Sequence, residues 1–225
     1  MKNRLLNYLG QFRPYSLAEL ILALFVLRPN VWHFLGAVLL WCGSIAVLES
    51  CHADWGREKM PAIVAVVLSI SGLLSFGVWQ GLPFVLAGIV YSWKKQYKWG
   101  LASPAVRGFQ MFFLLYPLWF LWPSVVIAAL LTVRNYVGDR RDVEEDRREG
   151  VTTWPVVMDQ KKDEPFGHLL FIFLTTTIWW WLSELSGPCL IGILAFEAGT
   201  YWLTPRESNK NVLAFGRKIL RYIRS

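Results

Sequence analysis

The sequence contains few charged residues and few cysteines. Asp, Glu, Lys and Arg make up 17% of its 225 residues, whereas ordinary soluble chains carry roughly 25%. The three cysteines, Cys42, Cys51 and Cys189, are scattered and show no C-x-x-C spacing. The low charge argues against an ordinary soluble domain, and the cysteine pattern argues against a zinc site or a disulfide framework.

Apolar sequence is abundant instead. The chain is 55% hydrophobic and contains 13 Trp, and long stretches with little charge alternate with short charged clusters. This alternation is typical of membrane spans and their loops. We therefore predict an all-α, polytopic membrane bundle of about eight transmembrane helices. The predicted spans are roughly 16–27, 31–48, 61–79, 82–93, 108–121, 123–137, 166–182 and 188–203.

The distribution of positive charge predicts the orientation of these spans. With the N-terminus in the cytoplasm, 22 of the 23 Lys and Arg residues fall in inside segments, Arg107 among them, and only Arg28 falls outside. We expect an integral multi-pass membrane protein with both termini in the cytoplasm. In a chain this apolar, the net charge of +7 favours contact with anionic lipid headgroups, not with nucleic acid. Residues 205–225 are expected to form a basic amphipathic cytoplasmic tail.

Two of the predicted cytoplasmic loops are acidic, and their acids recur at helical spacing. In the first motif, Asp54 and Glu58 are four residues apart. In the second, Asp139, Asp142 and Asp146 follow one another at intervals of three and four. On a helix that continues out of the membrane, each set lies on one helical face.

Matching acids of the two motifs are separated by the same number of sequence positions. Asp54 and Asp142 lie 88 positions apart, as do Glu58 and Asp146, and four predicted spans lie between the motifs. This spacing suggests that the domain of residues 1–204 is a duplication of a four-helix unit, with units at about 15–93 and 108–203. Each unit then contributes one acidic loop to a shared site, as repeats in membrane proteins commonly do.

Carboxylates that converge at a membrane boundary repel one another, and a divalent cation relieves that repulsion. Mg²⁺ is usually held by a few carboxylates together with phosphate oxygens and water. The motifs therefore predict a site for a metal-bridged anion such as a diphosphate. The cations that could stabilise its charge are Arg13, Arg57, Lys94, Lys95, Arg140 and Arg141.

The second motif resembles one of a known family. The run from Asp139 to Asp146 fits D-x-x-D-x-x-x-D, and the Gly, Thr and Trp-Pro that follow it are similar to the second aspartate motif of the UbiA superfamily of intramembrane prenyltransferases. Ser50, Asp54 and Glu58 resemble the family's N-x-x-x-D-x-x-x-D, with Ser in place of Asn and Glu in place of the last Asp. Arg13-Pro14 and the Y-x-x-x-K of Tyr91 to Lys95 are also family-like, so the resemblance covers about residues 10–160.

The resemblance implies a helical bundle around a central cavity open to lipid. It also implies Mg²⁺-dependent transfer of a prenyl group from its diphosphate to an aromatic or lipid acceptor in the membrane. The implied metal ligands are Asp54, Glu58, Asp139, Asp142 and Asp146. The implied catalytic residues are Asp54, Lys95, Asp142 and Asp146, and the implied diphosphate-binding residues are Arg13, Ser50, Tyr91, Lys94, Arg140 and Arg141.

Other interpretations stay open. A member of the same fold could use another donor or cyclise a prenyl substrate, and the substitutions at Ser50 and Glu58 are compatible with a non-catalytic lipid-binding homologue. The plainest alternative for the other charged residues of this segment is a solvated loop, in which Arg141 and Glu145 pair at i,i+4. These residues are Arg140, Arg141, Glu144, Glu145, Arg147 and Arg148.

Overall fold

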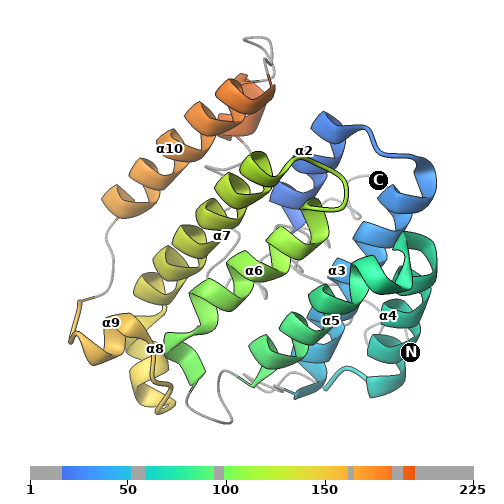
Figure 1. Cartoon of the computed structure of the whole chain (residues 1–225). Helices are drawn as coiled ribbons and strands as arrows, with labels where there is room; N and C mark the ends of the chain where they lie inside the picture. Colours follow the sequence, from blue (N-terminus) through green and yellow to red (C-terminus); the bar gives the residue numbers. More distant parts are fainter. Residues whose placement is uncertain (1–16, 52–58, 94–98, 162–164, 184–189, 196–225) are drawn as a thin grey trace, which may run out of the picture.

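The computed structural model describes residues 17–51, 59–93, 99–161, 165–183 and 190–195, and the regular structure in this part of the chain is helical (Figure 1). The longer helices are α2 (Ala18–Leu27), α3 (Val31–Cys51), α4 (Ala62–Phe76), α5 (Val78–Ser92), α6 (Ser103–Leu115), α7 (Leu121–Arg141) and α10 (Pro165–Ser183). The short helices are η2 (Trp99–Leu101), α8 (Val143–Arg148) and α9 (Trp154–Val157).

The all-helical prediction is confirmed for the described residues, and two of the helices fit a membrane span by length and composition. These are α3 and α7, each 21 residues long and predominantly apolar. Helices α4 and α5 are apolar but shorter, at 15 residues each. The predicted tail at 205–225 lies outside the described residues.

Several predicted boundaries were wrong. α5 begins at Val78 and not at residue 82, because a single residue, Gly77, connects it to α4. Gly77 adopts φ 106°, a conformation that side chains disfavour and that glycine reaches without a steric penalty. α6 begins at Ser103 and not at 108. α7 continues past the predicted span end at 137 to Arg141, as the helical spacing of the acids predicts.

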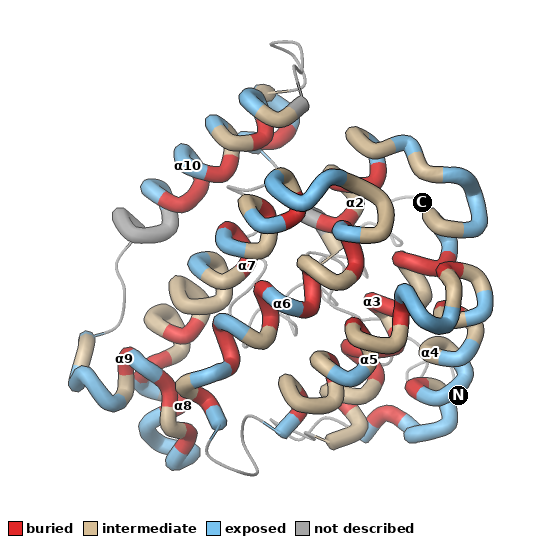
Figure 2. Tube along the Cα trace, in the orientation of Figure 1, coloured by how far each residue is buried: buried red, intermediate tan, exposed pale blue. Residues whose placement is uncertain are grey.

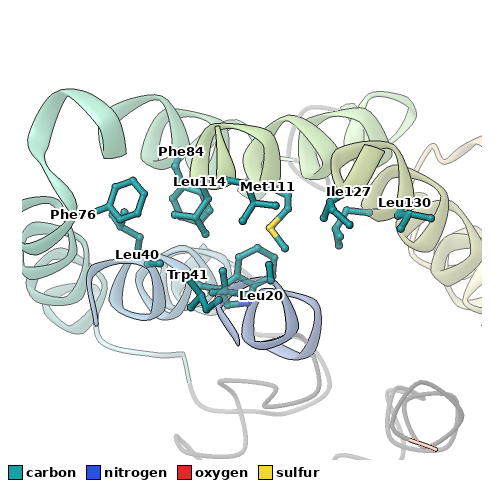
Figure 3. Packing of buried hydrophobic residues seen from close by; sticks show 14 of the residues in the cluster. Leu20, Leu40, Trp41, Phe76, Phe84, Met111, Leu114, Ile127 and Leu130 are labelled. Carbon is teal, nitrogen blue, oxygen red and sulfur yellow. The ribbon is translucent and has the colours of Figure 1, made fainter. Parts of the chain in front are cut away.

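The core lies where α3 meets α5, α6 and α7. Leu40 and Trp41 of α3 pack with Phe84 of α5 and with Met111 and Leu114 of α6, and all five side chains are buried (Figure 3). Burial of such large apolar side chains contributes roughly 1.5–3 kcal/mol each when the alternative is water. The packing of α3, α5, α6 and α7 therefore fixes where the ends of these helices lie.

Glycines allow α3 to approach α4 closely. A Cβ atom added at Gly36 would lie 2.6 Å from the backbone nitrogen of Phe76, and one added at Gly43 would lie 2.7 Å from the Ser69 hydroxyl. Gly36 and Gly43 are two helical turns apart and so share a face. Gly72 completes the contact from the α4 side, against Leu40. Small residues at a helix–helix contact are typical of close packing in membrane proteins.

Exposed positions line the outer sides of the helices (Figure 2), and many of them carry large apolar side chains. On α4, Ile63 and Leu74 are among the exposed apolar side chains, and on α10 Phe173 is 69% exposed and Trp181 71% exposed. A monomeric soluble protein rarely exposes such contiguous apolar surface. The helices thus bury polar groups on the inside and present hydrocarbon on the outside.

We expect Gly36→Ala to destabilise the fold by about 1–3 kcal/mol, because the added methyl group meets backbone atoms that cannot move away cheaply. The measurement is the free energy of unfolding in detergent micelles. Gly138→Ala in α7 is the control: its added methyl group meets nothing within 4 Å, so stability should stay the same or rise by up to about 1 kcal/mol. Equal losses for the two variants would contradict the close α3–α4 contact.

Candidate functional site

Hydrogen bonds between helices show which helix ends lie together. Gln110 Nε2 donates to Ser44 Oγ across 2.6 Å. The start of α4 lies at the end of α3, because the Met60 N–H donates to the Glu49 carbonyl across 3.3 Å. Gly77 turns the chain from α4 into α5, so α5 ends where α4 begins. Arg107, four residues after the start of α6, contacts Tyr91 near the end of α5. The end of α3 and the start of α6 therefore lie at the same end of the bundle.

A second hydrogen bond places the ends of α5 and α7 there too. The hydroxyl of Tyr91, near the end of α5, donates to Asn135 Oδ1, near the end of α7, across 3.0 Å. The ends of α3, α5 and α7 and the start of α6 therefore share one end of the bundle, which we call the motif end (Figure 1). The chain leaves α3 there toward Asp54 and Glu58, which lie outside the described residues.

The second acidic motif is helical at the motif end. α7 runs through Asp139 to Arg141, Asp142 follows as its cap, and α8 begins at Val143. The Asp142 N–H donates to the Gly138 carbonyl across 3.0 Å, and the Asp146 N–H donates to the Asp142 carbonyl across 2.9 Å. The helical hydrogen-bonding pattern thus passes through the junction, as the spacing of the acids predicts.

The acids of this motif are more buried than a solvated loop would leave them. Asp139 is 5% exposed and Asp146 is 0% exposed, and the Asp142 side chain is 16% exposed. Arg141 forms a two-pronged ion pair with Asp142, with Nε–Oδ1 at 2.9 Å and Nη2–Oδ2 at 3.0 Å. Glu144, Arg147 and Arg148 are exposed, as in the solvated-loop alternative. The Arg141–Glu145 pair stays a prediction, because the Glu145 side chain lies outside the described part of the chain.

A return segment, residues 151–160, folds back against the motif. Its first residue, Val151, donates its backbone N–H to the Asp146 carbonyl across 2.8 Å. The buried Thr153 then donates its hydroxyl to the Asp146 carboxylate, Oγ1 to Oδ2, across 3.4 Å. Asp146 is therefore held by the segment that follows it and forms part of the folded interior of the motif end.

The return segment is itself tied to other elements. The Trp154 indole donates to the Leu101 carbonyl of η2 across 2.8 Å, and Gly100 leaves no room for a Cβ atom against the Thr152 carbonyl. Further on, the Tyr136 hydroxyl donates to Gln160 Oε1 across 3.2 Å. These contacts connect the second motif to the start of α6 and to the last turns of α7.

The structure brings together part of the predicted site. Asp139, Arg140, Arg141, Asp142 and Asp146 lie at the motif end, and Tyr91 reaches α7 there. Ser50 lies in the last turn of α3, where its hydroxyl donates to the Val47 carbonyl of the same helix across 2.8 Å. The predicted site residues outside the described part of the chain are Arg13, Asp54, Glu58, Lys94 and Lys95.

The described carboxylates suit Mg²⁺ by chemistry but do not complete a site for it. Within the described residues, no three His, Cys, Asp or Glu side chains are close enough together to hold a metal ion. Mg²⁺ prefers oxygen ligands and commonly takes one or two protein carboxylates, with substrate phosphates and water filling the remaining positions. Asp139 and Asp142 provide such oxygens, and further ligands would have to come from the first motif or from a bound anion.

Arg107 is a functional candidate that the sequence pattern did not identify. The pattern assigned it to an inside segment, but the structure buries it in α6, where it is 9% exposed. Its guanidinium carbon lies 4.4 Å from the Trp41 ring centroid and 4.8 Å from that of Tyr91. Its Nη1 donates to Gln110 Oε1 across 2.6 Å. The spacing of Arg107 and Gln110, three apart at the start of an apolar segment, is the available signal for a buried polar face.

Five residues from four helices now form a connected series: Ser44, Gln110, Arg107, Tyr91 and Asn135. We call it the interhelical polar chain. Asn135 lies four residues before Asp139 on α7, so the two share a helical face. The polar chain therefore reaches the second motif from inside the bundle.

The motif end holds acidic and basic side chains close together. It combines partly buried carboxylates with the arginines Arg140 and Arg141 at the boundary of an apolar bundle. A two-pronged guanidinium also matches phosphate oxygens geometrically. Comparison with family models, curated proteins and solved structures finds no match to this chain.

We expect Thr153→Val to destabilise the protein by about 1–3 kcal/mol, because the buried Asp146 carboxylate loses a hydrogen-bond donor while the side-chain shape is kept. Thermal unfolding in micelles measures the change. Thr177→Val in α10 is the matched control, since this exposed hydroxyl donates to the Phe173 carbonyl of its own helix, and its effect should stay within about 0.5 kcal/mol. A Thr153→Val variant as stable as the control would show that the return segment does not hold Asp146.

Proposed function

We propose that this chain is a multi-pass membrane prenyltransferase of the UbiA type. It transfers a prenyl group from a prenyl diphosphate to an aromatic or lipid acceptor within the membrane and depends on Mg²⁺. The observation that carries the proposal is that the end of α3, which leads into the first acidic motif, and the end of α7, which bears the second, share the motif end. The end of α3 and the second acidic motif, which are far apart in the sequence, therefore lie in one region.

The apolar exterior supports the membrane part of the proposal. Many positions of α4 and α10 are exposed (Figure 2), and large apolar side chains occupy several of them. Helices α3 and α7 are long enough to cross the hydrocarbon. Lipid is the environment in which such faces are stable. We propose eight spans around a cavity open to lipid, with the motif end and both termini in the cytoplasm.

In the reaction, the bond between C1 of the prenyl chain and the diphosphate oxygen breaks, and its electron pair leaves with diphosphate. A new bond forms between C1 and the acceptor, which loses a proton. Asp54, Glu58, Asp139, Asp142 and Asp146 would hold the metal, which neutralises diphosphate charge when bound. The apolar interior excludes water from the developing allylic cation.

In this proposal the arginine and lysine side chains bind the leaving diphosphate, a role separate from that of the carboxylates. Arg141 already grips a carboxylate with two parallel N–H groups, the same arrangement that binds phosphate oxygens. Arg13, Lys94, Lys95 and Arg140 are proposed to join it around the leaving diphosphate, with Tyr91 and Ser50 nearby. Such fixed positive groups stabilise charge that develops in the transition state.

A second candidate, a non-catalytic homologue that binds a lipid diphosphate, is favoured by one observation. Ser50 stands where the family pattern has Asn, and its hydroxyl donates to the Val47 carbonyl of its own helix. A protein of this kind would bind pyrophosphate in the presence of Mg²⁺ and release none from prenyl diphosphates. Donors other than prenyl diphosphates, and cyclisation of a prenyl substrate, are separated from the leading proposal by screening substrates and products.

The test of the leading proposal is diphosphate release from labelled prenyl diphosphates by membranes that contain the protein. We expect Asp142→Asn and Asp146→Asn to lower the rate by about a hundredfold or more, because each removes a charge opposite the metal-bridged diphosphate. Glu144→Gln is the control: its side chain is exposed on the same short helix, and it should keep the parent rate. Parent-like rates for both Asp variants would contradict the assignment of the site.

The proposed orientation predicts the labelling of single cysteines in a cysteine-free background. Asn30, between α2 and α3, should be reached by a membrane-impermeant maleimide in intact cells when replaced by Cys, because it lies at the end of the bundle opposite the motif end. Glu144→Cys should react only after the membrane is permeabilised. The reverse pattern would place the motif end outside the cell and overturn the orientation.

A further inference from the structure

Arg107 is a charged residue in the interior of a bundle whose outer faces are apolar. It lies between two aromatic rings, Trp41 of α3 and Tyr91 of α5, within cation–π distance of both. Burying a charge inside such a bundle is unfavourable by several kcal/mol unless its surroundings compensate. A position of this kind therefore needs a role that an apolar side chain would not fulfil.

The partners of Arg107 join helices that are remote in sequence. Through Gln110 it connects to Ser44 of α3, and through the ring of Tyr91 it connects to Asn135 of α7. Each link is directional, so sliding or rotating one helix breaks it. In a lipid-facing bundle, packing alone restrains such motions less strictly, since lipid and side chains are equally apolar.

One end of the interhelical polar chain lies on α3, which precedes the first acidic motif in the sequence, and the other lies on α7, which bears Asp139. Ser44 is ten positions before Asp54 in the sequence, and Asn135 is four positions before Asp139. We propose that Arg107 is a positioning residue: the chain that it centres fixes the register of α3 against α7 and so sets the separation between the end of α3 and the carboxylates of Asp139 and Asp142. The proposal rests on the proposed function for its purpose, but its geometric part stands on the hydrogen bonds and the cation–π contacts alone.

The guanidinium is specifically suited to this position. Its flat surface stacks on the Trp41 and Tyr91 rings, and its N–H groups point outward in the plane, one of them to Gln110. Methionine has a similar length and can occupy the space between the rings, but it donates no hydrogen bond. Arg107→Met therefore removes the link while keeping most of the packing, and Gln110→Leu removes the neighbouring link.

The first experiment measures binding of inorganic pyrophosphate with Mg²⁺ to the full chain in lipid nanodiscs by calorimetry. We expect Arg107→Met and Gln110→Leu to weaken binding by about tenfold or more, the size of effect seen when supporting partners of metal ligands are removed. Arg148→Met on α8 and Gln80→Leu on α5 are the matched controls, because both side chains are exposed, and their affinities should stay within about twofold of the parent.

The second experiment measures the distance between the end of α3 and α8 in the absence of any ligand. Spin labels are placed on Cys51, at the end of α3, and at Glu144→Cys on α8, in a chain with Cys42 and Cys189 replaced by Ser. The parent and the two control variants should give one narrow distance distribution. Arg107→Met and Gln110→Leu should broaden or shift it, and Arg107→Lys, which keeps charge and a donor, should restore part of the narrow component.

The outcomes separate this inference from the proposed function. If Arg107→Met and Gln110→Leu lower only the melting temperature and leave both the distance distribution and the pyrophosphate affinity unchanged, the positioning role is wrong. If the parent binds no pyrophosphate, the proposed function fails, and the distance distributions alone decide whether the chain sets the register. If Arg107→Met does not fold, Gln110→Leu gives the decision.

Discussion

Polar side chains inside this bundle are satisfied within their own helix or by a neighbouring helix, and the contacts between helices restrict how those helices pack. Arg107 shows the constraint most clearly: its guanidinium stacks on Trp41 and Tyr91 and donates to Gln110. Satisfying it requires α3, α5 and α6 to keep one mutual register. The same requirement extends to α7 through Tyr91 and Asn135. Glycine contacts bring the helices near one another, and the polar contacts select which of the close arrangements is adopted.

The motif end follows from this register. Four helix ends lie together there, so the second motif lies near the end of α3. Its carboxylates are partly enclosed. Asp146 is held by the return segment, whereas Asp142 is paired with Arg141 and stays more accessible. The two acids therefore differ in environment: Asp146 is fully buried against the return segment, and Asp142 is paired with Arg141 and partly accessible.

Patterns in the sequence predicted the features that depend on residues close together in the chain. Hydropathy predicted the helices, and the spacing of Asp139, Asp142 and Asp146 predicted their shared helical turns. The turn at Gly77 was missed because a single glycine with positive φ ends one helix and starts the next with no loop to mark it. The burial of Arg107 was not predicted because its contact Trp41, and Ser44, the partner of the neighbouring Gln110, lie more than sixty positions away in the sequence. No local period reports such contacts. The first motif, with Asp54 and Glu58, and the duplication into two four-helix units stay predictions.

The central claim is that carboxylates from the two motifs meet at one end of the bundle around a metal-bridged diphosphate. The most direct measurement is an experimental structure of the full chain in lipid with Mg²⁺ and an unreactive prenyl thiodiphosphate. The account predicts density for the diphosphate at the motif end, between Asp54 and Asp142, with the prenyl tail running into the apolar interior. A structure in which Asp54 and Asp142 lie at opposite ends of the bundle, or in which the analogue binds away from both, would contradict it.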